Sequence, residues 1–213
     1  MLKKSDYIYK IFEKEMKKIS RKKKVVDIGT SKRFAKEMEY FRHFFSKNYQ
    51  AVGYKPKMIY GKDNCDLSGD ILNLPFKNRS IDAVICLEVI EHVVDPMKAI
   101  TEIYRVIKPK GTVILTTPFL LPFHGKGKSV KSFSHSSYPD FWRFTHQGLE
   151  FLFKDFSEIR VIPFTSTLEH YLERFFQLIN FSFFYQRLIK KFVNKLPRKL
   201  GCATHRHLVI ASK

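Results

Sequence analysis

The hydrophobic positions of the chain follow two alternating periods. Amphipathic segments with a helical repeat separate short, continuous apolar runs, and this rhythm is typical of a parallel sheet covered by helices. The apolar runs predict strands at residues 24–29, 51–54, 81–87, 112–117, 158–164 and 207–211, with a weaker candidate at 65–68. We therefore expect an α/β domain whose strands are mostly buried.

Helical periodicity occupies the segments between these runs. Apolar residues recur at helical spacing over residues 7–19, with lysines on the opposite face, and again over residues 34–45. Asp95 is a predicted N-cap and Pro96 a predicted first helical residue. The helix that they begin is expected to extend through Ile107 and to stop at the Lys-Pro-Lys-Gly that follows.

A longer helical segment covers residues 168–196, which contain neither glycine nor proline. Its longest uncharged run, residues 175–186, is shorter than the roughly 20 residues that span a bilayer. We therefore expect that the segment does not cross a membrane. Its C-terminal part has separate basic and apolar stripes, which suit either an interfacial helix or a helix packed on the domain.

The composition favours one globular domain inside the cell. Of the 213 residues, 44% are hydrophobic, which is ample for a packed core. The three cysteines, at positions 65, 86 and 202, form no CxxC pair, so we expect neither a disulfide framework nor a metal site. Lysines interrupt the apolar residues of the N-terminus, where a signal peptide would need a continuous block. These features predict a cytoplasmic protein.

Positive charge is concentrated at the two ends of the chain. The net charge is +19, of which residues 1–24 hold +7 and residues 174–213 hold +9. Basic ends around a nearly neutral centre indicate an anionic partner, which is either a membrane surface, with the protein peripherally bound, or the less favoured nucleic acid. The alternative is that the lysines form solvated helix faces.

The strongest chemical signal begins at the first predicted strand, which ends in Asp27-Ile-Gly29 and leads into a helix. Such a junction places backbone N–H groups at a sheet edge, where a nucleotide-like ligand binds. Further motif segments follow at residues 69–76, 81–93 and 106–115. In this order and spacing, the four segments resemble the class I S-adenosylmethionine-dependent methyltransferases of the type 11 group. Residues 138–149 are similar to a segment found in a subset of that family.

The resemblance implies a Rossmann-like, doubly wound sheet of seven strands with a helical insertion before the last strand. The cofactor, S-adenosyl-L-methionine, would lie across the carboxyl ends of the first strands. On this basis the single domain comprises an N-terminal basic helix (1–23), a cofactor-binding core (24–164), a basic amphipathic helical insertion (165–200) and a final strand (201–213).

By position in the motifs, the resemblance assigns cofactor contacts to seven residues. They are Asp27, Gly29 and Thr30 at the methionine end, Asp70 and Ile71 beside the adenine, and Leu87 and Glu88 near the sulfonium. The Asp70 carboxylate would accept a hydrogen bond from the adenine amine. Asp70 also fits a turn after Gly69, while Glu88 and His92 also fit helix capping or surface contacts.

Two positions differ from the family pattern. The usual glycine-rich turn has a single glycine, Gly29, and continues with Lys32 and Arg33, which are candidates for holding the methionine carboxylate or a phosphate-bearing ligand. Lys55 follows the second strand, where an acidic residue normally receives the ribose hydroxyls. These differences keep a second function open, in which a methyltransferase-like protein without catalysis binds RNA or an anionic membrane through its basic flanks.

The acceptor is expected beside the segment that follows the fifth strand. Methyl transfer needs alignment above all, and it needs a base only when the acceptor must lose a proton. The base candidate is His124, and the substrate candidates are Tyr138, Asp140, Trp142 and Arg143. Trp142 also fits packing at the sheet edge. Cys86 lies inside an apolar run and is interpreted as a core residue.

The sequence thus predicts S-adenosylmethionine-dependent methyl transfer to an unidentified acceptor. The residues after the fourth strand, Cys86-Leu-Glu-Val-Ile90, lack the Asn/Asp-Pro-Pro-aromatic motif of amino methylation on nucleic-acid bases. The candidate acceptors are a small metabolite and a membrane-associated saccharide or lipid-linked intermediate.

Overall fold

The computed structural model describes residues 7–30, 38–54, 65–121, 123, 125, 139–163 and 206–213. Seven strands form one sheet in the order β3-β2-β1-β4-β5-β7-β6, in which β7 is antiparallel to both neighbours and the other pairs are parallel. The strands are β1 (Val25–Ile28), β2 (Tyr49–Gly53), β3 (Leu67–Ser68), β4 (Ile81–Leu87), β5 (Ile107–Pro118), β6 (Glu158–Pro163) and β7 (Arg206–Ser212). This is the expected Rossmann-like, doubly wound sheet.

The strand order reverses between β1 and β4. From β1 the chain moves outward to β2 and β3, and it then returns to the other side of β1 as β4. In open α/β sheets, ligands bind beyond the carboxyl ends of the strands at such a reversal. The fold therefore points to the edge where Ile28, Gly53 and Leu87 end their strands.

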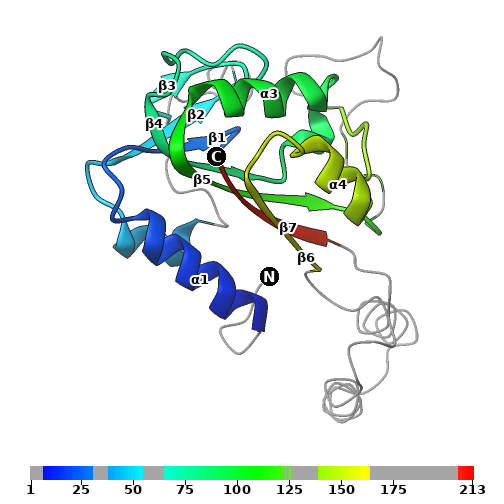
Figure 1. Cartoon of the computed structure of the whole chain (residues 1–213), viewed down its shortest axis with the longest axis horizontal. Helices are drawn as coiled ribbons and strands as arrows, with labels where there is room; N and C mark the ends of the chain where they lie inside the picture. The colour runs from blue at the N-terminus through cyan, green and yellow to red at the C-terminus, as the bar shows by residue number, and fades with distance from the viewer. Residues whose placement is uncertain are drawn as a thin grey trace.

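Helices cover both faces of the sheet (Figure 1). One face packs against α1 (Tyr7–Ile19) and the 3₁₀ helix η1 (Glu39–Phe44), and the other against α3 (Pro96–Val106) and α4 (His146–Leu152). A short 3₁₀ helix, η2 (Ile90–His92), follows β4. The helix expected over residues 7–19 is confirmed.

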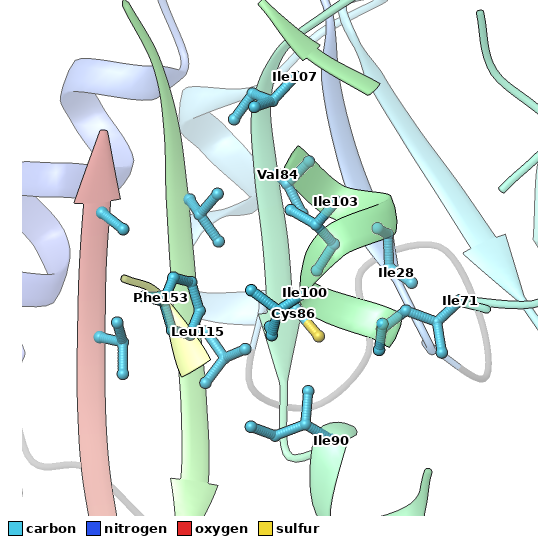
Figure 2. Close-up of a cluster of buried hydrophobic side chains, with 14 of the residues drawn as sticks. Ile28, Ile71, Val84, Cys86, Ile90, Ile100, Ile103, Ile107, Leu115 and Phe153 are labelled. Atoms are coloured by element: carbon cyan, nitrogen blue, oxygen red, sulfur yellow. The ribbon is translucent and has the colours of Figure 1, made fainter. Parts of the chain in front are cut away.

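The side chains of β4 alternate between two hydrophobic cores, as the period of a strand requires. Val84 and Cys86 pack toward Ile103 and the rest of α3 (Figure 2), whereas Ile85 belongs to the core on the α1 side. Cys86 is fully buried, and this burial raises the pKa of its thiol well above the ordinary value. Its interpretation as a core residue is confirmed.

The start of α3 is as predicted, but its end is not. The Asp95 carboxylate accepts a hydrogen bond from the Lys98 backbone N–H at 2.9 Å, which is the expected N-cap. The helix stops at Val106, and Ile107 begins β5, paired with Ile81 ahead of a register shift. Ile107 is fully buried, so it fits the apolar positions of the helical period and of the strand period equally. Periodicity alone could therefore not assign it to the strand.

Several sequence predictions fall outside the described residues. These are the helical insertion at 165–200 together with Lys32, Arg33, Lys55, His124 and Tyr138. Of the helix expected over 34–45, the described part forms η1, with Met38 and Phe41 buried. Among the described helices, none combines the length and apolar character needed to span a membrane.

Candidate active site

The turn after β1 depends on Gly29. Its φ of +78° lies in the left-handed region that favours glycine. A Cβ at this position would lie 2.5 Å from Val89 Cγ2, and the Gly29 N–H donates to the Val52 carbonyl at 2.8 Å. The turn is therefore packed tightly against the loop after β4, which joins the two sides of the strand reversal.

A second close approach lies at the end of β2. A Cβ on Gly53 would lie 2.9 Å from the Thr30 carbonyl oxygen and 2.7 Å from Cys65 Sγ. The Cys65 thiol donates to the same Thr30 oxygen at 3.4 Å. The chain thus brings Gly29 and Thr30 beside the start of the β3 segment, with their backbone at the sheet edge.

Asp27 lies within β1, two residues before Gly29. Only 3% of the residue is exposed, and its carboxylate accepts a hydrogen bond from the Tyr49 hydroxyl of β2. This pair supports the turn from the α1 side of the sheet. Sequence reasoning missed Tyr49, because the predicted second strand began two residues later. Direct contact between Asp27 and a cofactor stays a prediction.

Asp70 forms the turn that follows β3. Its Oδ1 accepts from the Leu72 backbone N–H at 2.9 Å, and the Asp70 carbonyl accepts from the Asn73 N–H at 2.9 Å. This is an Asx-type turn, as the residue's position after Gly69 allows. Ile71 is buried in the core on the α3 side. Contact between the Asp70 carboxylate and an adenine stays a prediction.

Glu88 follows Leu87 at the carboxyl end of β4, with φ at +54°. A non-glycine residue in this region is uncommon, and such strain is concentrated at functional sites. The Glu88 N–H donates to the Thr116 carbonyl of β5 at 3.0 Å, and Glu88 Oε2 lies 3.4 Å from Arg206 Nε of β7. Glu88 therefore connects the ends of three strands.

The next turn, η2, holds a fully buried carboxyl group on Glu91. Burial, followed by the neighbouring charge of Glu88, raises the pKa of Glu91 well above its ordinary value. The Glu91 carbonyl accepts from the backbone N–H of Phe141 at 2.8 Å and of Trp142 at 3.3 Å. The loop after β4 is thus tied to the segment predicted to face the acceptor.

The described substrate candidates, Asp140, Trp142 and Arg143, all make contacts within the protein. Arg143 Nη2 donates to Asp140 Oδ2 at 2.7 Å and Arg143 Nε to the Leu121 carbonyl at 3.1 Å. Trp142 Nε1 donates to the Val93 carbonyl at 2.8 Å. These contacts fix residues 139–145 beside η2, while contact with an acceptor stays a prediction. Within the described ranges, no group of acidic, histidine and cysteine side chains could hold a metal ion.

Comparison with known proteins identifies this arrangement. A family model described as a methyltransferase domain, of the type 11 group, matches residues 26–115, which cover β1 to β5 and their connections. Residues 26–115 therefore form a class I methyltransferase domain. Proteins of this family use S-adenosylmethionine as the methyl donor. The resemblance of the motif segments to this family is confirmed.

Individual relatives match only part of the sequence. An uncharacterised protein of Methanocaldococcus jannaschii is 45% identical over 49 residues, which are 23% of this chain and 21% of that protein. Norajmaline N-methyltransferase of Rauvolfia serpentina is 45% identical over 47 residues, which are 22% of this chain and 16% of that enzyme. The matches to these curated relatives thus span about a fifth of their length or less.

Solved structures share the fold over nearly the whole methyltransferase. The phosphoethanolamine N-methyltransferase 2 of Haemonchus contortus with S-adenosyl-L-methionine has a TM-score of 0.55 at 21% identity, covering 95% of this chain and 52% of that chain. A methyltransferase of Archaeoglobus fulgidus has a TM-score of 0.56 at 15% identity, covering 98% of this chain and 100% of that chain. At these identities the likeness concerns the fold.

Proposed function

We propose that this methyltransferase binds S-adenosylmethionine at the strand reversal and transfers its methyl group to an acceptor held beyond β4 and β5. The observation that carries this proposal is the turn at Gly29, where a left-handed backbone is packed against Val89 at the carboxyl edge. This turn brings main-chain groups of the β1 end next to the β4 end. A nucleotide-like ligand is recognised by such backbone groups at the reversal of an α/β sheet.

The residues at this edge offer chemical groups that suit each part of the cofactor. Gly29 and Thr30 offer backbone groups to its methionine end, and the Asp70 carboxylate offers an acceptor to the adenine amine. Leu87 and Glu88 flank the position of the sulfonium, which supplies an electrophilic methyl group. The contribution of the protein is then to align the acceptor with that group and to exclude water.

The segment 139–145 and η2 supply the wall for the acceptor. Because Arg143 and Trp142 fix this segment through side-chain hydrogen bonds, the acceptor would meet a prearranged surface. A small metabolite or a membrane-associated saccharide or lipid-linked intermediate remains the proposed acceptor class.

Calorimetric titration with S-adenosylhomocysteine tests the proposal. We expect saturable binding by the wild type. For Asp70→Ala we expect a loss of about 1–3 kcal/mol in binding free energy, because a hydrogen-bonding partner that the bound adenine would cover is removed. Asp70→Asn is the matched control, since its amide oxygen can still accept from Leu72 N–H and preserve the turn. Its NH₂ group would face the adenine amine, and because both groups are donors, no hydrogen bond can form between them.

Three results separate the alternatives. Weaker binding in both variants supports the adenine contact, while weaker binding in Asp70→Ala alone shows that only the turn matters. Absence of binding by the folded wild type contradicts the proposal. That last result would support the alternative of a methyltransferase-like protein that uses its basic flanks to bind RNA or anionic membrane.

A further inference from the structure

Thr117 and His207 form a buried polar pair outside the set of residues assigned to the cofactor. They lie directly opposite one another in the β5–β7 register. Thr117 is fully buried and His207 is 3% exposed. Within the part of the chain that the structure describes, Thr117 Oγ1 and His207 Nδ1 are buried and have no hydrogen-bond partner. Buried polar atoms are nearly always paired, so two such atoms on adjacent strands point to a ligand group.

The pair lies next to the proposed position of methyl transfer. Thr116, the neighbour of Thr117, accepts from the Glu88 N–H at 3.0 Å, and Arg206, the neighbour of His207, lies 3.4 Å from Glu88 Oε2. Glu88 is the residue that flanks the expected sulfonium. The pair therefore lies at the same edge of the sheet, one residue along each of the two strands from a contact with Glu88.

The surroundings of His207 favour an uncharged ligand. Burial, with a smaller contribution from His146, lowers the pKa of His207 to about 4, so its imidazole is neutral at neutral pH. Its ring lies 5.7 Å from that of Phe119 and 6.1 Å from that of His146. Because both side chains of the pair are buried, a protonated amine would have to be desolvated beside a neutral imidazole and a hydroxyl, whereas a hydroxyl ligand adds no charge.

We propose that Thr117 and His207 bind an uncharged hydroxyl group of the methyl acceptor. A hydroxyl both donates and accepts, so it can donate to a neutral imidazole nitrogen while it accepts from the threonine hydroxyl. The pair thus selects a hydroxyl-bearing acceptor, such as a saccharide or a phenol, over an amine. The inference rests on the proposed function, because it assigns the ligand to the acceptor side of that site.

The test uses the whole 213-residue chain with ¹⁵N-labelled histidine and saturating S-adenosylhomocysteine. Binding of S-adenosylhomocysteine is measured on the same sample by calorimetry. Phenol is the hydroxyl probe. Anisole, which lacks the donor, and benzylamine, which is cationic, are the matched controls. We expect phenol to shift the His207 ring resonances in a saturable manner, and we expect no comparable shift from anisole or benzylamine.

A variant pair separates binding from folding. Thr117→Val removes only the buried hydroxyl and should keep the fold, because it also removes an unpaired polar atom. We expect it to weaken phenol binding about two- to tenfold, the effect of one hydrogen bond. Thr112→Val, which alters a buried threonine at the other end of the β5–β7 pairing, should leave phenol binding unchanged.

The possible failures are distinct. If S-adenosylhomocysteine binds but phenol does not shift His207, or if anisole or benzylamine shifts it equally, the inference is wrong while the proposed function stands. A long-lived water bound to His207 that phenol does not displace would also overturn it. If S-adenosylhomocysteine itself does not bind, the proposed function fails and the acceptor role fails with it.

Discussion

The two halves of the carboxyl edge of the sheet are held by different kinds of contact. At the ends of β1, β2 and β3, the contacts are made mainly by backbone groups, as in the Gly29–Val52 hydrogen bond and the Asp70–Leu72 turn. At the ends of β4, β5 and β7, charged and polar side chains meet from distant segments, as in the Glu88–Arg206 pair. In the proposed site, the cofactor half, at the ends of β1, β2 and β3, depends on backbone shape. The proposed acceptor half, at the ends of β4, β5 and β7, depends on buried electrostatics.

This difference determines what each half tolerates. A backbone site fails when a side chain is added to it, because a Cβ has no space there. A buried charge network fails when one member is removed, because the remaining partner is left uncompensated in a low-dielectric interior. Substitutions that add atoms should therefore damage the cofactor half, and substitutions that remove charges should damage the acceptor half.

The largest expected effect is that of Arg143→Ala. Asp140 has a fully buried side chain, and Arg143 both pairs with it at 2.7 Å and donates to the Leu121 carbonyl. Removing the arginine leaves a buried carboxylate without its cation, so we expect the free energy of unfolding to fall by about 3–5 kcal/mol. Urea unfolding followed by circular dichroism measures it.

Arg42→Ala is the control for that variant. Arg42 and Glu39 have the same i, i+3 spacing, but their side chains are 67% and 59% exposed. We expect a change within about 0.5 kcal/mol, as is usual for a surface pair. Equal losses in Arg42→Ala and Arg143→Ala would show that burial does not distinguish the two pairs.

The second effect is that of Gly29→Ala in the cofactor half. A left-handed conformation costs a non-glycine residue about 1–2 kcal/mol, and overpacking against Val89 adds about 1–3 kcal/mol. We expect a combined destabilisation of about 3 kcal/mol together with weaker binding of S-adenosylhomocysteine. Adding Val89→Ala should recover the stability lost through overpacking, while the cost of the left-handed backbone should remain. A double variant no better than Gly29→Ala would place the clash elsewhere.

The sequence predicted the strands and the glycine turn after β1 well because both depend on local patterns. The apolar runs located the ends of six strands to within two residues, whereas β5 begins at Ile107, five residues before the predicted start. The motif at Gly29 located the reversal of strand order. The acceptor half could not be predicted in the same way. Pairing of Thr117 with His207 depends on the antiparallel register of two strands separated by about half of the domain, and no local pattern encodes it.

Individual residues show the same limit. The end of α3 was misplaced because a fully buried Ile107 suits a helix and a strand equally. Asp140 and Arg143 were recognised as polar residues of the right segment, but their mutual ion pair depends on how residues 139–145 fold over η2. Tyr49 supports Asp27 only through the alignment of β1 with β2.

The third effect is an acid-dependent loss of stability from His207. Its pKa is lowered to about 4 in the folded protein from an ordinary value of 6.5, so the unfolded chain binds a proton first as the pH falls. Stability is therefore lost below about pH 6.5, by about 2 kcal/mol between pH 7 and pH 5. His207→Gln should flatten this part of the profile in urea unfolding. The neighbouring His146→Gln, which alters a half-exposed side chain, should retain it.

The smallest effect has the opposite pH dependence and comes from Glu91. Its raised pKa means that the folded protein holds a proton that the unfolded chain releases, so the wild type loses stability as the pH rises above about 4.5. Glu91→Gln keeps the size of the side chain and removes the ionisation. We expect this variant to be more stable than the wild type at pH 8, by about 1 kcal/mol, which is typical of one buried polar group. The advantage should disappear near pH 4.5, and Glu150→Gln, at an exposed glutamate of α4, should show no such trend. If Glu91→Gln is destabilised equally at both pH values, the carboxylate forms bonds that an amide cannot replace, and the acceptor half tolerates a buried negative charge better than the structure implies.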